Sequence, residues 1–162
     1  MGEQNRYQVR FDWGVDGAAA VAADADVLVW VDAIAARPAP LDALPAAPAV
    51  VETGLAGAVA TGQWILDLQE ARQRRTTVAL VAAGADRGSG LRFAAEDLLA
   101  AGAVADALEA RGIDAMSPEA AVADAAYRTL GRAASSLFAA VAGTGEPNRS
   151  APVVRRAHPD QR

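Results

Sequence analysis

Short apolar segments recur along the first half of the chain, and their patterns predict strands of two kinds. Residues 7–13 alternate apolar and polar side chains, which indicates an amphipathic edge strand with one face in water. Residues 27–31 are apolar throughout and residues 77–81 are apolar after Thr77, which is typical of strands buried on both faces of a parallel sheet. A further strand is expected at residues 49–52.

Alanine-rich segments with helical periodicity lie between and after these strands. The last of them begins with clear helix-start signals, because Ser117 can cap it, Pro118 fits its first turn and Glu119 lies beside its positive end. Asp16 is expected to cap the first helix in the same way. Helices are therefore predicted at residues 18–23, 59–70, 94–110 and 117–143.

The order of these elements defines the fold class and the domain organisation. Strands that alternate with helices through short loops predict an α/β fold, a mostly parallel sheet covered by helices. Four prolines between residues 37 and 48 predict a loop there, because proline disrupts both helix and central strand. Residues 1–143 are expected to form a single α/β domain, and the polar residues 144–162 a disordered tail.

Composition and charge exclude several functions. The chain of 162 residues has a formal net charge of -5, which argues against binding nucleic acid or an anionic membrane. It contains no cysteine and no lysine, and its one histidine, His158, lies in the predicted tail. Disulfides, thiolate chemistry, a P-loop lysine and a histidine-based triad are therefore excluded. No signal peptide or membrane span is recognisable, so a cytoplasmic location is expected. The small helical side chains would permit a homodimer.

Candidate chemistry lies where the predicted strands end, because ligands of open α/β sheets bind beyond the carboxyl ends of the strands. Asp32 follows the second strand, where its carboxylate could bind Mg²⁺ or simply cap the next turn. Glu96 and Asp97 lie in the first turn of a predicted helix. The helix dipole explains their presence there, but acid–base or metal-binding roles follow if this turn faces Asp32.

The glycine-rich loop after the fourth strand offers a second kind of site. Backbone N–H groups near Gly84 and Gly88 could hold an anion, with positive charge supplied by Arg87 or Arg92. The loop matches neither of the common glycine-rich nucleotide-binding motifs. A plain flexible connection is the alternative interpretation.

Several stretches of the chain together resemble the 2-phosphosulfolactate phosphatase family. The resemblance extends over most of the chain to about residue 143, with a gap in the middle. Its most specific part is the segment at residues 92–103. The matching stretches read VRFDWG at 9–14, DVLVWVD at 26–32, LVAAG at 80–84, RFAAEDLLAAGA at 92–103 and SPEAA at 117–121.

This resemblance implies a Mg²⁺-dependent phosphatase that hydrolyses a small anionic phosphate monoester. By the same resemblance, Asp32, Glu96 and Asp97 are the expected catalytic acids, and Asp32 and Glu96 are the expected metal ligands. Arg37, together with the arginines of the glycine-rich loop, would hold a phosphoryl oxygen.

An alternative follows from the middle of the chain. The proline-rich residues 37–48 stand where the family has its central motifs, which have no counterpart here. The chain could therefore be a catalytically inactive, shortened relative that serves as a binding or assembly module.

Overall fold

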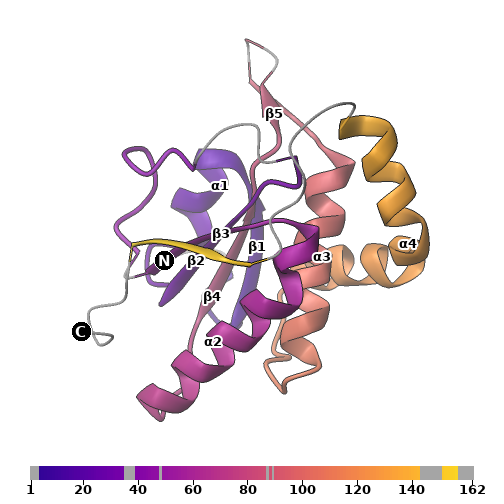
Figure 1. Cartoon of the computed structure of the whole chain (residues 1–162). Coiled ribbons are helices and arrows are strands. Elements are labelled where there is room, and N and C mark those ends of the chain that lie inside the picture. The colour runs from indigo at the N-terminus through magenta and orange to yellow at the C-terminus, as the bar shows by residue number, and fades with distance from the viewer. Residues whose placement is uncertain are drawn as a thin grey trace.

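The computed structural model describes residues 4–34, 39–47, 49–86, 88, 90–142 and 151–156. Strands and helices alternate along most of this length, as the sequence pattern predicts (Figure 1). The elements are β1 (Val9–Trp13), α1 (Gly14–Val21), β2 (Val27–Val31), β3 (Ala49–Thr53), a short 3-10 turn (Leu55–Gly57), α2 (Ala58–Arg72), β4 (Val78–Ala82), β5 (Ala85–Asp86), β6 (Leu91–Arg92), α3 (Ala95–Glu109), α4 (Pro118–Ala142) and β7 (Val153–Arg156).

The central sheet has five strands in the order β1-β4-β2-β3-β7. Strands β1, β4, β2 and β3 are parallel, and β7 is antiparallel to β3. The carboxyl ends of the four parallel strands therefore meet at one edge of the sheet. This arrangement confirms the predicted α/β fold with a mostly parallel sheet.

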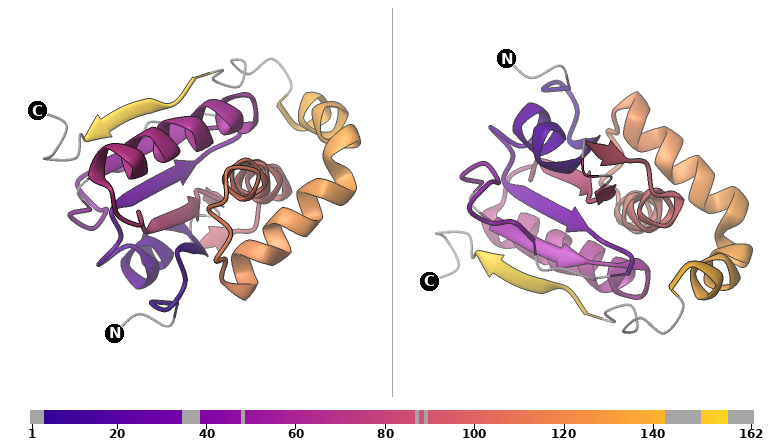
Figure 2. Two further views of the ribbon diagram at one scale, coloured as in Figure 1. Left: turned by 90° about the horizontal axis from the view of Figure 1, so that it is seen from below. Right: turned by 90° about the horizontal axis from the view of Figure 1, so that it is seen from above.

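Helices cover the sheet on both faces, with α1 on one side and α2, α3 and α4 on the other (Figure 2). The α1 face is completed by residues 39–47, the described part of the proline-rich connection between β2 and β3. Leu44 and Ala47 from this connection are buried against the sheet. The connection thus covers this face of the sheet, as a crossover helix does between other parallel strands.

Alternate residues of the central strands enter the two layers. In β2, Val27, Val29 and Val31 pack against α2 and α3, while Leu28 and Trp30 face α1 and the proline-rich connection. Every residue of β2, β3 and β4 is buried. Burial on both faces explains why the sequence of β2 and β4 is apolar without alternation.

The first strand lies at the edge of the sheet as predicted, but its polar face is not in water. Arg10 is only 1% exposed, since α1 and the chain around residues 4–8 cover it. Its guanidinium donates to three backbone carbonyls and pairs with Asp24. These hydrogen bonds and the ion pair offset the free-energy cost of taking the guanidinium out of water. The prediction that one face of β1 lies in water is therefore wrong. An alternating pattern does not show whether the polar side chains meet solvent or polar groups inside the protein.

The predicted disordered tail also needs correction within its described part. Residues 153–156 form β7, which pairs with β3, and Arg155 Nη2 lies 2.8 Å from Glu52 Oε2. Glu52 is buried and also accepts a hydrogen bond from the backbone N–H of Ala39. The remaining residues of the predicted tail, 144–150 and 157–162, lie outside the described residues.

Two smaller features complete the fold. The loop predicted after β4 contains a short antiparallel hairpin, in which β5 pairs with β6. Gly84, just before it, adopts a positive φ of 66°, and an added Cβ there would lie 2.5 Å from a methyl carbon of Leu91. No helix in the described part of the chain has the length and apolar character that crossing a membrane requires.

Candidate functional site

A pocket of about 760 Å³ lies at the carboxyl edge of the parallel strands. It is formed by the residues that follow β1, β2 and β4, together with the start of α1 and part of the β5–β6 hairpin. This is the position at which open α/β sheets bind ligands. Residues of particular interest in its lining are Trp13, Asp16, Trp30, Asp32, Gly84 and Leu91.

Asp97 connects two of the strand ends beneath this pocket. Its Oδ1 accepts a hydrogen bond from the backbone N–H of Ala33 at 2.8 Å, directly after β2. Its Oδ2 accepts one from the N–H of Gly84, also at 2.8 Å, directly after β4. No side chain caps the start of α3. Both oxygens of Asp97 therefore bind the strand ends, and neither makes a capping hydrogen bond to its own helix.

The environment of Asp97 favours its neutral form. Asp97 is only 3% exposed, and this burial raises the pKa of its carboxyl group to about 7. The two backbone N–H groups act in the opposite direction, and the negative charges of Asp32 and Glu96 add to the increase. A carboxyl group with this pKa is close to half-ionised at neutral pH.

The structure brings the three predicted acids into one electrostatic neighbourhood. Asp32 and Glu96 both act on Asp97, although Asp32 lies in a distant part of the sequence. Asp32 lines the pocket, and its Oδ1 also accepts a hydrogen bond from the N–H of Ile34 at 3.1 Å. Asp32, at the end of β2, thus caps the next turn and also lines the pocket.

The donor atoms suit a hard cation, but the three acids do not form a closed set of ligands. Among the described residues, only Asp106, Glu109 and Asp124 place three ligand atoms within 4.8 Å of one another. A magnesium ion binds one or two carboxylates and keeps several water molecules. Asp32 and Glu96 supply ligands of the type and number that magnesium uses, whereas both oxygens of Asp97 already accept hydrogen bonds from backbone N–H groups.

The residues that were predicted to bind phosphate have different surroundings from one another. The N–H of Gly84 is bound to Asp97, and the side chain of Arg92 lies 4.0 Å from Glu96 Oε1. Gly88 is exposed on the hairpin loop and does not line the pocket. Arg37 and Arg87 lie outside the described residues. The described part of the pocket lining carries two carboxylates and no basic side chain.

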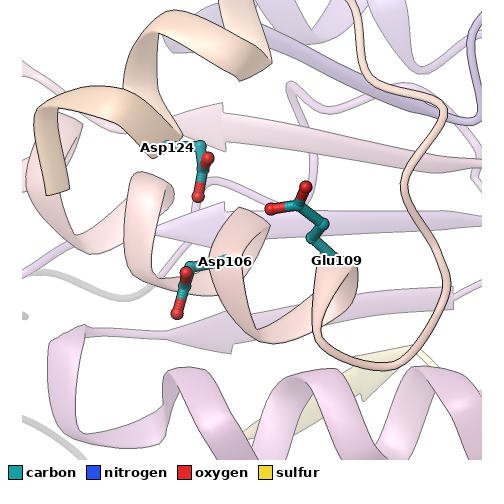
Figure 3. A group of neighbouring side chains, drawn as sticks. All are labelled: Asp106, Glu109 and Asp124. Carbon is teal, nitrogen blue, oxygen red and sulfur yellow. The ribbon is translucent and has the colours of Figure 1, made fainter. Parts of the chain in front are cut away.

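A second group of acids, which the sequence analysis missed, lies between α3 and α4 (Figure 3). Asp106 and Glu109 come from α3, and Asp124 comes from α4. Arg128 contacts all three, with its Nε 3.1 Å from Asp106 and 3.0 Å from Asp124. Desolvation and the neighbouring Asp106 raise the pKa of Asp124. The cluster is an ion-pair network that joins two helices, and its sequence signal is the i, i+3 and i, i+4 spacing of these residues.

We expect Arg128→Gln to destabilise the protein by about 1 kcal/mol at low ionic strength, because three carboxylates lose their shared cation. The effect should shrink in high salt, which screens half-exposed charges. Urea denaturation at low and at high salt measures this difference. Arg111→Gln is a control outside the network, and a loss that is equal for both variants would contradict the expectation.

Three residues that line the pocket were not among the residues predicted for the site. Trp13 lies in the segment predicted as an edge strand and Trp30 in a predicted buried strand, and Asp16 was expected to cap the first helix. Instead α1 begins at Gly14, so that Asp16 lies in its first turn and lines the pocket with both tryptophans. Asp32 was selected because ligands bind beyond the carboxyl ends of strands. The same reasoning could have selected Trp13, since Trp13 also ends a strand of the sheet.

The fold and the site together define an α/β protein with an acidic pocket at the carboxyl edge of a parallel sheet. No protein-family model and no curated protein matches the chain.

Proposed function

We propose that the protein is a Mg²⁺-dependent hydrolase of a small phosphate monoester, similar to the 2-phosphosulfolactate phosphatase family. The observation that carries this proposal is that Asp32 lines the pocket while Asp97, the neighbour of Glu96, binds the backbone N–H of Ala33, the residue after Asp32. A pocket whose described lining is negative repels a free phosphate dianion. A divalent cation would therefore be needed for phosphate binding.

Each of the three acids has a distinct part in this proposal. Asp32 and Glu96 would hold the metal ion, which would supply charge neutralisation at the phosphoryl oxygens. Asp97 is a positioning residue, since both of its oxygens bind backbone N–H groups at the ends of β2 and β4. It keeps Ala33, the neighbour of Asp32, at a fixed distance from Gly84 on the other wall of the pocket.

The proposal predicts that Asp32→Asn abolishes a magnesium-dependent activity. Purified protein is assayed with and without Mg²⁺ on para-nitrophenyl phosphate and on phosphosulfolactate. We expect turnover only with the metal, and a loss of at least about 100-fold in kcat/KM for the variant, since one charged metal ligand is removed. Calorimetric titration with Mg²⁺ should show weaker binding to the same variant.

Asp67→Asn is the matched control, because Asp67 is an exposed acid on α2 and hydrogen-bonds Gln63. Its kinetics and metal affinity should equal those of the unaltered protein. Turnover that Asp32→Asn leaves unchanged would refute the site, and absence of both turnover and Mg²⁺ binding would refute the hydrolase.

The second candidate is a catalytically inactive relative that only binds a small molecule. The absence of basic side chains from the described pocket lining favours it, because phosphate enzymes normally supply positive charge to the phosphoryl group. Saturable binding of a ligand in the pocket without turnover of either ester would support this candidate.

A further inference from the structure

The pocket at the carboxyl edge combines aromatic and negatively charged groups. Trp13 and Trp30 supply two indole rings, and Asp16 and Asp32 supply two carboxylates. No basic side chain belongs to the described part of the lining. Indole rings attract cations through the negative potential of their faces, and a nearby carboxylate adds a direct charge interaction.

Both indole rings are held in place by packing. Trp13 makes an edge contact with Phe11, with ring centroids 5.6 Å apart, and a tilted contact with Phe93 at 4.7 Å. Trp30 is 6% exposed and packs in the cluster under α1. Aromatic groups fixed in this way lose little conformational entropy when a ligand binds.

The two carboxylates extend the negative region across the pocket. Asp16 is exposed in the first turn of α1, and Asp32 follows β2. Glu96 and Asp97 add further acidic groups at the same edge, where Asp97 binds the backbone N–H groups of Ala33 and Gly84. A ligand without positive charge gains nothing from this field, whereas an organic cation is stabilised by it.

We infer that the pocket receives a compact organic ammonium group between its tryptophans and Asp16. The inference deepens the proposed function and rests on it in one respect: the phosphate ester that is hydrolysed is the ester of an amino alcohol. The phosphoryl group lies toward Asp32 and Glu96, and the ammonium group lies toward Trp13 and Asp16. The chemical class recognised is a small, free quaternary or protonated amine.

The direct test compares choline with dimethylbutanol, its uncharged carbon isostere, by calorimetric titration of the full chain without metal. Choline should bind at least about tenfold more tightly, because the two ligands differ only in charge. Trp13→Leu and Asp16→Asn should each weaken choline binding about fivefold or more. Asp114→Asn changes the net charge by the same amount outside the pocket lining and should have no effect.

Equal binding of the two ligands, or binding of neither, overturns the inference. Sedimentation with phosphatidylcholine vesicles separates a free ammonium ion from a lipid headgroup, and binding to vesicles without binding of free choline also overturns it. Thermal melting of each variant confirms that the substituted proteins remain folded.

A second measurement separates this inference from the proposed function. With Mg²⁺ present, phosphocholine should be hydrolysed with a kcat/KM about tenfold above that of dimethylbutyl phosphate. Equal hydrolysis of both esters overturns the ammonium site and leaves the hydrolase intact. Tight choline binding without hydrolysis of any ester overturns the hydrolase and leaves the ammonium site intact.

Discussion

Replacing Gly102 with alanine should destabilise the protein by about 3 kcal/mol or more. Gly102 lies in α3 where this helix crosses α4. An added Cβ would lie 2.1 Å from the carbonyl oxygen of Ala123 and 2.7 Å from its carbonyl carbon. Because these are backbone atoms of α4, no side-chain rotation can relieve the overlap, and the two helices must separate.

The same substitution at Gly131 provides the control. Gly131 also lies in a helix, but the nearest atoms to an added Cβ are ring carbons of Tyr127 at 3.5 Å, an ordinary contact distance. Alanine has the higher helix propensity, so we expect Gly131→Ala to stabilise the protein by about 0.5–1 kcal/mol. Urea denaturation measures both variants, and a loss below about 1 kcal/mol for Gly102→Ala would mean that α4 packs differently.

Part of the fold could be predicted from the sequence alone. Local patterns were sufficient for β2, β4, α3 and α4, since continuous apolar runs and the Ser117–Pro118 start signal are properties of single segments. The order of the strands is not a local property. It depends on which strand pairs with which, and β4 enters between β1 and β2 although it follows both in the chain.

The mistaken interpretations share a cause. Arg10 was predicted to face water because its strand alternates apolar and polar side chains, and the residues of β7 were predicted to be disordered because they lie in a polar tail. In the structure Arg10 pairs with Asp24, and Arg155 of β7 pairs with Glu52, which is 103 residues away in the chain. A polar segment becomes ordered when a distant segment supplies its partner, and nothing in its own sequence records that partner.

The candidate site, like the fold, could be predicted only where single segments of the sequence are informative. The ends of the strands identified Asp32 as a residue of interest, the predicted helix start added Glu96 and Asp97, and the resemblance assigned all three a catalytic role. That Asp97 binds the N–H groups of Ala33 and Gly84 could not be predicted, because it requires α3 to begin directly beneath two adjacent strand ends. The aromatic part of the pocket was not predicted, because tryptophan is common in strands and the presence of Trp13 and Trp30 there does not by itself indicate a binding site.

Asp97 should make the stability of the protein fall as the pH rises toward neutrality. Its pKa is about 7 in the folded protein, compared with 3.8 as the ordinary value for an aspartate. Between these values the folded protein holds a proton that the unfolded chain has released. Raising the pH therefore favours unfolding, by about 1.4 kcal/mol per pH unit up to about pH 7, and has little further effect above it.

Asp97→Asn isolates this contribution, because asparagine cannot titrate and all other groups remain. The free energy of unfolding of the unaltered protein, minus that of the variant, should fall by about 2 kcal/mol between pH 5 and pH 7 and by only a few tenths of a kcal/mol, roughly, between pH 7 and pH 8. Urea denaturation at these pH values measures the difference. A difference that does not change with pH would mean that Asp97 is ionised throughout. In that case the two hydrogen bonds from Ala33 and Gly84 would outweigh the cost of burying its charge.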